Sequence, residues 1–488
     1  MRSKLRQHLL GLVAAAGLCA SGTFGMFVAL QSVPVDRIIA NLTAFSKEHP
    51  ENAAGFYSLG RAHSLAFTKG VDHLPTYPSG GNDRPPYHVS DGSMPSAGPR
   101  EAYTKEVPNA LASEQMAFHL VSGIRSFQRA IELTPDDSLQ MMSLAFLLEK
   151  GAPRSSLVDF VPGIGVPSNA AESAPAKDLS RQLEMLDKDA AQKPTLNAEN
   201  LDIETVAAIW PERRSFGPNA RELLERAVQN QWTRLAAQTY LQAFRLAAAE
   251  EIEGQKAKQR GMFLGYRGLV TFQAGEAFLR LAKEPVNSDV RKTDVTEVTT
   301  GVAKAKKMEL GMAITPIVFS IAGAEPLDAL VDPSARVRFD LDGSGLPTEW
   351  EWIRPQTGIL VWDPEGKGKI ESGRQLFGNA TWWLMFENGY RALDALDDDR
   401  NGELAGNELR GLAVWFDSNS DGASSSAEVV SVESAGIAGL SVRPSNSDGE
   451  ILSSPSGLRM RDGRLLPTYD WIARGTRVAA SDSLAQVP

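Results

Sequence analysis

The pattern of apolar residues changes along the chain near residue 310. Before this point, apolar positions recur at helical spacing, and the Ala- and Leu-rich run from Arg221 to Gln259 predicts a long helix. After it, short β-like runs alternate with glycine turns, and seven of the nine tryptophans follow Glu349. The pattern predicts an α+β protein of several domains, in which an N-terminal helical scaffold precedes a C-terminal module of short strands.

The first 33 residues predict a signal peptide or a signal anchor. Three basic residues among the first six precede an apolar run from Leu9 to Leu30. A cationic end followed by an apolar segment is typical of export signals, and this run is also long enough to span a bilayer uncleaved. We therefore expect the rest of the chain to be extracytoplasmic (secreted, periplasmic or anchored) and to meet the membrane only through this segment.

The negative charge of the chain is concentrated in one region. The net charge is −10, and residues 326–440 alone contain 20 acidic against 9 basic side chains. An acidic region attracts cations and repels phosphates, so we expect no nucleic-acid partner. The single cysteine, Cys19, lies in the N-terminal apolar run, which excludes an intrachain disulfide framework.

Residues 34–150 contain two stretches with the spacing of paired helices. Rings and small residues recur at fixed intervals, at Phe56, Leu59, Gly60 and His63 in the first stretch and at Gly123, Phe127, Ala130 and Pro135 in the second. These spacings resemble the two halves of a tetratricopeptide repeat, separated by a Pro/Gly/Ser-rich insertion at about residues 69–112. The resemblance implies a helical surface that contacts another protein.

The other boundaries follow from composition. Residues 151–305 begin with a loop-rich break and continue as a second helical region that carries no candidate chemistry. We place the C-terminal module at residues 311–472 and a flexible tail at residues 473–488.

An acidic pattern in the module predicts two metal-binding loops. Each matches the twelve-residue spacing D-x-[DN]-x-[DN]-G-x5-E, which offers side chains at positions 1, 3, 5 and 12, a backbone carbonyl at position 7 and a glycine turn at position 6. Calcium takes six to eight oxygen ligands, so we expect two Ca²⁺ ions; the alternative is a pair of solvated acidic turns. The predicted ligands are Asp397, Asp399, Asn401, Glu403 and Glu408 in the first loop and Asp417, Asn419, Asp421, Ala423 and Glu428 in the second.

The spacing also predicts how the two loops are connected. Only residues 409–416 separate them, too few for the two helices of an ordinary EF-hand pair. A repeat that shares one short helix, as in dockerin modules, fits better, and Phe386 and Tyr390 mark a helix that enters the first loop. At position 8, Leu404 is expected to pack the first loop against its neighbour, and Ser424 gives the second loop a weaker contact.

Two weaker copies of the pattern lie upstream. Their metal candidates are Asp340, Asp342 and Ser344 in one copy and Asp363 and Glu365 in the other. The second copy has Lys367 at position 5 and Arg374 at position 12. Because a lysine that faces the ion repels it, we expect this copy to bind no metal and Lys367 to pair with Asp363 in its place.

Across residues 314–442 these four acidic segments occur in series, beginning with "FDLDGSG". Their order resembles the EF-hand-like calcium-binding region of secreted bacterial haemolysin-type (RTX) proteins, and the resemblance implies an exported calcium-binding module. The sequence departs from that family because Ser320 and Ala322 stand where its opening motif has aspartates. The sequence also lacks the glycine-rich nonapeptide arrays of those toxins, so pore formation is not implied.

The sequence shows no catalytic constellation, and we predict that the protein is not an enzyme. All six histidines lie in the first quarter of the chain, without metal-ligand spacing, and His63 fits a helix-packing position. The alternative is a calcium-stabilised extracellular carbohydrate-binding protein or hydrolase, which would use paired carboxylates or exposed rings. Candidate rings for a sugar-stacking surface are Trp350, Trp352, Trp382 and Trp383.

Overall fold

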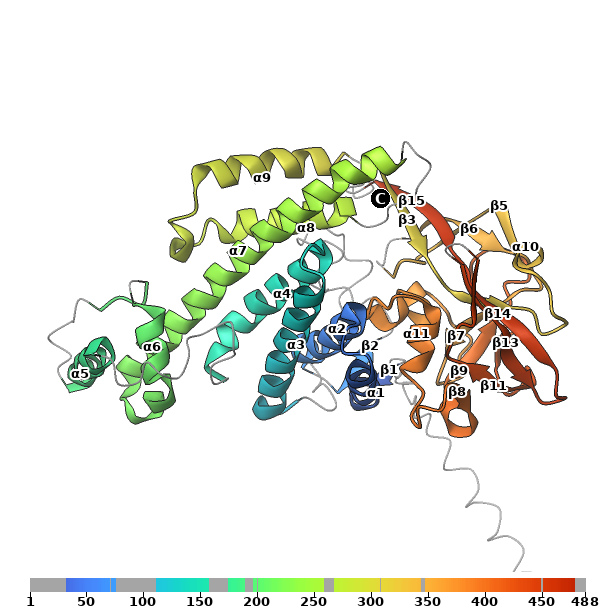
Figure 1. Ribbon diagram of the computed structural model, residues 1–488, viewed down its shortest axis with the longest axis horizontal. Helices are drawn as coiled ribbons and strands as arrows, with labels where there is room; N and C mark the ends of the chain where they lie inside the picture. Colours follow the sequence, from blue (N-terminus) through green and yellow to red (C-terminus); the bar gives the residue numbers. More distant parts are fainter. Residues whose placement is uncertain are drawn as a thin grey trace, which may run out of the picture. The chain divides into compact units, whose positions relative to one another are not determined.

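The computed structural model in Figure 1 describes most of the chain between Ser32 and Val478. The described residues are 32–70, 72–75, 111–157, 174–188, 196–199, 201–258, 267–307, 309–343, 347–448 and 451–478. Most of the predicted signal segment, most of the insertion, Ser344 and the end of the predicted tail lie outside them. No helix within these ranges is both long enough and apolar enough to cross a bilayer.

The N-terminal part of the described chain is helical, as the sequence predicts. The helices before residue 310 are α1 (Val35–Glu48), α2 (Ala53–Lys69), α3 (Ser113–Leu133), α4 (Ser138–Gly151), α5 (Ala174–Lys188), α6 (Ile203–Ile209), α7 (Pro218–Lys258), α8 (Arg267–Leu281) and α9 (Lys292–Ala305). The long helix predicted at residues 221–259 is α7, which packs along α4 and α8 (Figure 1). Its fully buried alanines, such as Ala236 and Ala243, allow these neighbours to approach closely.

Helices α2 and α3 pack through the residues that carry the repeat-like spacing. A Cβ atom on Gly60 of α2 would lie 2.7 Å from the ring of Phe127 of α3, so only glycine permits this contact. His63 is buried between the same helices, with its Nδ1 atom 2.9 Å from that of His119. Burial lowers the pKa of His63 to about 3, so the residue is neutral and serves packing, as predicted.

The C-terminal part of the described chain consists mainly of antiparallel strands, which confirms the α+β class. Its strands are β3 (Glu309–Ile314), β4 (Ile317–Phe319), β5 (Val331–Phe339), β6 (Thr348–Ile353), β7 (Gly358–Trp362), β8 (Glu403–Ala405), β9 (Leu412–Trp415), β10 (Val429–Ser431), β11 (Ile437–Ser441), β12 (Asn446–Asp448), β13 (Ile451–Met460), β14 (Leu465–Asp470) and β15 (Ala473–Val478), and the N-terminal part adds β1 (Ser32–Pro34) and β2 (His73–Pro75). Two short helices, α10 (Leu327–Leu330) and α11 (Gly389–Asp394), lie among them.

These strands form two larger sheets and one small one. The nine-stranded sheet has the order β10-β9-β7-β4-β14-β13-β11-β8, with β12 paired to β13. The four-stranded sheet has the order β3-β15-β6-β5, and β1 pairs with β2 near the start of the chain. Strands far apart in sequence are therefore neighbours, as β4 and β14 are, so the C-terminal region folds as a unit.

Strand β15 corrects the predicted start of the tail. The sequence predicts a flexible tail at residues 473–488, but Ala473–Val478 pair with β3 along their whole length. On the other side, Gly475 lies opposite Trp350 of β6, and a Cβ atom there would lie 2.7 Å from the indole ring. The absence of a side chain at Gly475 lets the two strands pair.

Helices α1 and α2 share a hydrophobic cluster with the C-terminal sheets. Val35, Ile38 and Leu42 of α1 are almost completely buried in the cluster that also contains Phe377 and Leu393. Residues on both sides of the boundary predicted near residue 310 therefore contribute to one core. Burial of each large aliphatic side chain stabilises such a core by about 1.5–3 kcal/mol.

One ionisable group lies deep in the C-terminal core. Asp470, at the end of β14, is only 3% exposed, and its carboxylate accepts a hydrogen bond of 2.8 Å from the backbone amide of Gly389, where α11 begins. Burial raises the pKa of Asp470 from its ordinary value to about 7. The folded protein therefore retains a proton that the unfolded chain releases near pH 4.

This difference predicts how stability depends on pH. The contribution of Asp470 is fully present below its unfolded pKa and is lost as pH rises toward 7, by up to about 1.4 kcal/mol per pH unit. Asp470→Asn keeps an acceptor for the Gly389 amide but cannot ionise, so it should remove this contribution. Chemical denaturation at pH 5 to 8 measures the effect, with the exposed Asp462→Asn as the control. Identical pH profiles for the wild type and Asp470→Asn would contradict the prediction.

Candidate metal centre

The first loop, residues 397–408, folds its backbone around the buried carboxylate of Asp397. Two successive backbone amides donate to that carboxylate, Asn401 N to Oδ1 at 3.2 Å and Gly402 N to Oδ2 at 2.9 Å. Arg400 and Gly402 have φ values of 60° and 93°, in the left-handed region, which turns the chain back around the carboxylate. The glycine at position 6 adopts this conformation at little cost, as the motif requires.

Glu408 closes the first loop from the other side. Its Oε1 atom accepts a hydrogen bond of 2.8 Å from the amide of Asp398, and its Oε2 atom accepts one of 3.1 Å from the amide of Ala405. Carboxylate oxygens of Asp397, Asp399 and Glu408 lie within 4.8 Å of one another. The structure thus brings together three predicted ligands whose oxygens can converge on one cation.

The other two predicted ligands of the first loop lie beside these carboxylates. Asn401 donates from Nδ2 to Asp399 Oδ2 at 2.8 Å, and its own Oδ1 accepts from the amide of Glu403 at 2.8 Å. The carboxylate of Glu403 is paired with Arg459 at 2.7 Å. That ion pair does not involve the backbone carbonyl, which is the predicted ligand at this position.

The second loop, residues 417–428, repeats these hydrogen bonds position by position. The amides of Asp421 and Gly422 donate to Asp417 at 3.2 and 2.9 Å, and Ser420 and Gly422 have positive φ. Glu428 accepts from the amides at positions 2 and 9 at 3.1 and 3.2 Å, as Glu408 does. Asn419 donates to Asp421 at 2.8 Å, and the amide of Ala423 donates to Asp421 at 2.7 Å.

Burial disfavours the charged form of the central carboxylate in each loop. Asp397 and Asp417 are both fully buried, and burial raises the pKa of each above its ordinary value, although backbone hydrogen bonds oppose the rise. The hydroxyl of Ser418, 2.8 Å from Glu428, instead lowers the pKa of that closing carboxyl. Because desolvation disfavours a lone buried charge, a divalent cation beside Asp397 or Asp417 would stabilise the ionised form.

The indole of Trp352 is a partner of the second loop that sequence reasoning missed. Its Nε1 atom donates to Asp417 Oδ2 at 2.6 Å, and the ring lies 5.7 Å from that of Trp415 at an edge-to-face angle. Gly422 donates to the same oxygen and Asp421 to the other, so three donors fix the orientation of the carboxylate. The pattern Trp-Glu-Trp did indicate that Trp350 and Trp352 share a face of a strand, but not which group lies opposite.

The four candidate rings do not form a sugar-stacking surface. Trp350, Trp352, Trp382 and Trp383 are each at most 1% exposed, so no face of these rings is open to a carbohydrate. Large aromatic side chains contribute most when they are buried, and here they fill the core between the sheets. The interpretation of these residues as a carbohydrate site is therefore wrong.

The upstream copy at residues 363–374, which we call the lysine loop, has the same backbone shape. The amides of Lys367 and Gly368 donate to Asp363 at 3.1 and 2.8 Å, and Gly366 at position 4 has a φ of 63°. The ammonium group of Lys367 forms an ion pair with Glu365 at position 3, and the predicted partner Asp363 accepts a hydrogen bond from the backbone amide of the same lysine. The ammonium group of Lys367 thus lies beside Glu365, where a metal ion bound by this carboxylate would be.

Arg374, at position 12 of the lysine loop, connects it to the acidic turn upstream. Its guanidinium lies 3.9 Å from the ring centre of Trp383 and donates from Nε to the carbonyl of Gly343 at 2.7 Å. In that turn Asp340 and Asp342 are buried, and Asp340 accepts a hydrogen bond of 2.8 Å from the hydroxyl of Ser372. The remaining candidate of this turn, Ser344, lies outside the described residues.

The position-8 residues contact different neighbours from those expected. Leu404 lies in β8 and pairs with Leu440 of β11, so the first loop packs on the sheet. Ser424 accepts a hydrogen bond from the amide of Ile370 at 2.6 Å and donates to its carbonyl at 3.2 Å. Since Ile370 is position 8 of the lysine loop, the second loop is paired with that loop.

The segment between the two loops is a strand and not the predicted short helix. Leu412–Trp415 form β9, which is fully buried and pairs with β7 and β10. A four-residue apolar run fits a helix or a strand equally well, and here pairing with two neighbouring strands decides between them. The helix expected before the first loop is present as α11, which contains Tyr390.

Comparison with known proteins finds similarity in this C-terminal part of the chain. A family model described as the SPM domain matches residues 328–472, which include both loops and the lysine loop. The iron-regulated protein FrpA of Neisseria meningitidis serogroup C is 31% identical to this chain over 135 residues. That alignment covers 26% of this chain and only 12% of the relative, so the chain spans a small part of the relative's length.

Proposed function

We propose that this protein is an exported calcium-binding protein, in which two Ca²⁺ ions stabilise the C-terminal module. The observation that carries the proposal is the repeated geometry of the two loops. In each, a fully buried aspartate accepts two backbone amides, and a glutamate eleven residues later closes the turn. In the first loop this arrangement brings carboxylate oxygens of Asp397, Asp399 and Glu408 within 4.8 Å of one another.

Calcium fits these loops better than other biological cations do. The predicted side-chain ligands are oxygens of Asp, Asn and Glu, which suit a hard cation, and neither loop contains His or Cys. A twelve-residue loop with a closing glutamate offers the irregular, oxygen-rich shell that calcium accepts and that magnesium disfavours. The residues present therefore fit the ion.

The role proposed for the ions is structural. Without a cation, the carboxylates of Asp397, Asp399 and Glu408 repel one another at the distances found in the loop. Binding offsets that repulsion and fixes β8, which lies within the first loop and begins at Glu403. Binding in the second loop fixes β10, which directly follows Glu428. Extracellular calcium modules work at Kd values on the order of 10⁻⁴–10⁻³ M, which suits a protein exported by its N-terminal segment.

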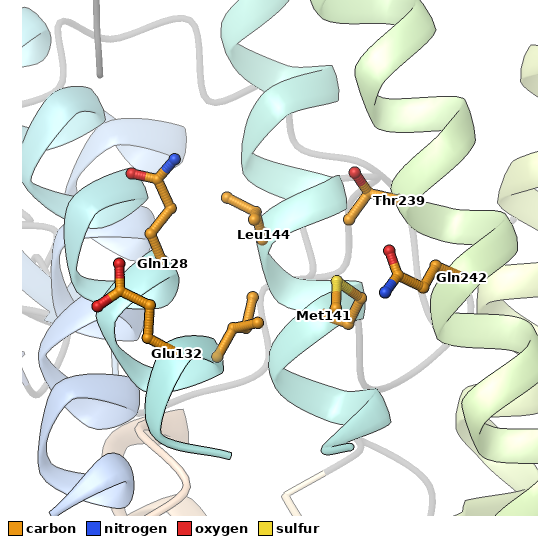
Figure 2. A pocket seen from close by; sticks show the side chains of 7 residues that line it. Gln128, Glu132, Met141, Leu144, Thr239 and Gln242 are labelled. Carbon is orange, nitrogen blue, oxygen red and sulfur yellow. The ribbon is translucent and has the colours of Figure 1, made fainter. Parts of the chain in front are cut away.

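The helical region is proposed to contact another protein. A pocket of about 480 Å³ lies between α3, α4 and α7, and Figure 2 shows polar and apolar side chains at its edge. It is lined by Gln128, Ile131, Glu132, Met141, Leu144, Thr239 and Gln242. Mixed lining of this kind supports binding. Its carboxylate, Glu132, is paired with Arg129, and the hydroxyl of Thr239 donates to the carbonyl of Leu235, so we propose no catalytic role for it.

Removal of the closing glutamates tests calcium binding. Titration calorimetry of the full chain after chelation should show two sites, of which Glu408→Gln and Glu428→Gln each weaken one by on the order of tenfold or more, because ligand charge sets affinity. Free calcium at 100 times Kd should also stabilise the fold by about 2.7 kcal/mol per site. The exposed Glu433→Gln, close to the second loop, serves as the matched control. Absence of both heat and a thermal shift at millimolar calcium would reject the proposal.

Trp352 provides a test of the second loop alone. Trp352→Phe removes one of the three donors that orient Asp417, and loss of such a supporting hydrogen bond typically weakens metal affinity about 10- to 100-fold. The matched control is Trp350→Phe, since Trp350 is equally buried but donates to the carbonyl of Phe339. Calorimetry should show weaker binding at one site in Trp352→Phe only. Equal affinities in the two variants would show that the indole does not orient the ligand.

A further inference from the structure

Helix α1 holds the residues on both sides of the first ligand of the first loop. Arg37 donates from Nη2 to the carbonyl of Leu396 at 2.8 Å and from Nε to the carboxylate of Asp398 at 2.9 Å. Asn41, one turn later, donates from Nδ2 to the same carboxylate at 2.9 Å and to the carbonyl of Ala395 at 3.0 Å. Asp397 therefore lies between two residues that α1 fixes in place.

The other end of α1 holds position 4 of the same loop. Arg400, whose left-handed backbone makes the turn, donates to Glu48 at 2.8 Å and to Asp394 at 2.6 Å. Asp394 also pairs with Arg391, whose guanidinium lies over the ring of Phe45 at 3.1 Å from its centre. Because Glu48 and Phe45 both belong to α1, these contacts of Arg400 and Arg391 connect position 4 of the loop to the helix.

The position of α1 along the loop is fixed by apolar contacts as well as by hydrogen bonds. Val35, Ile38, Leu42 and Phe45 of α1 are each at most 6% exposed, and Asn41 is 7% exposed between them. An uncharged donor buried among these residues keeps its geometry, whereas exposed ion pairs contribute little by themselves. Asn41 is therefore the strongest single connection between the helix and the loop.

We propose that calcium binding by the first loop and docking of α1 are thermodynamically linked. The inference rests on the proposed calcium function and adds regulation of one of its two sites. Helix α1 positions the groups that flank Asp397. When α1 is docked, the ligands of the first loop are therefore already in the geometry that binds the ion. When α1 is released, these ligands must be ordered at the moment of binding, which lowers the affinity. Linkage is reciprocal, so calcium in the first loop stabilises the docked helix by the same factor.

The second loop provides an internal comparison. Its partners among the described contacts are Trp352 and Ile370, both in the C-terminal module, and none of the hydrogen bonds described above joins it to α1. The two loops have the same backbone hydrogen bonds, so a change in α1 should distinguish between them. Any variant that affects both loops equally acts through general stability.

The experiment measures calcium affinity one loop at a time in the full chain. Glu428→Gln leaves the first loop intact, and Glu408→Gln leaves the second. In each background we add Arg37→Gln with Asn41→Leu, which removes the described hydrogen bonds of Arg37 and Asn41 to residues 395–398 while keeping similar side-chain volumes. Lys47→Gln, on the exposed surface of α1, makes the same change of charge as Arg37→Gln and serves as the control.

The expected result is a loss of affinity of about tenfold, within the usual range of coupling, in the first-loop background only. Unchanged affinity in that background, or equal weakening in both, overturns the linkage and leaves the calcium function standing. If neither Glu428→Gln nor Glu408→Gln binds calcium while α1 is unchanged, the calcium function is rejected, and the linkage with it.

A second measurement needs no change in α1. Hydrogen exchange of the amides of Val35–Glu48 is followed with and without calcium in the same two backgrounds. Linkage requires that calcium slow this exchange about tenfold in Glu428→Gln, in which the first loop is intact. In Glu408→Gln, in which only the second loop is intact, calcium should leave the exchange unchanged. Equal protection in both backgrounds, or none in either while calorimetry shows binding, overturns the inference.

Discussion

The burial of one carboxylate in each loop is the constraint on which the C-terminal region depends. Asp397 and Asp417 are removed completely from water, and an ionised group in that position destabilises the fold unless something compensates its charge. The left-handed residues at positions 4 and 6 turn two amides toward the carboxylate, and the closing glutamate ties the ends of the turn together. The shape of each loop follows from this single requirement.

Three loops with one backbone shape meet that requirement in three ways. The lysine loop contains its own cation, because Lys367 lies beside Glu365. The second loop adds an indole donor from β6, and the first loop is braced from outside by a helix of the N-terminal region. The proposed ions would complete the second and first loops, whereas the lysine loop already has a positive charge. The same turn can therefore serve as a binding site or as a fixed structural element.

Local geometry was predictable from the sequence, and long-range contacts were not. The D-x-[DN]-x-[DN]-G spacing specifies hydrogen bonds between residues four or five apart, so the shape of both loops and of the lysine loop could be inferred. Trp352 lies 65 residues from Asp417, and no local pattern marks such a contact. The run Leu412–Trp415 is too short to show a helical or a strand period, and its neighbours β7 and β10 decide its conformation.

The contact between α1 and the first loop joins the two ends of a long chain, and this affects the order in which the protein folds. Arg37 and Asp398 are separated by 361 positions. A chain that emerges from its N-terminus first exposes Val35, Ile38 and Leu42 long before the sheets that bury them exist. Closure of so large a loop is slow, because the entropy of the intervening chain must be lost before the contact forms. Helix α1 is therefore among the last elements to reach its final place, and until then its apolar face is an exposed surface that must be kept from aggregating.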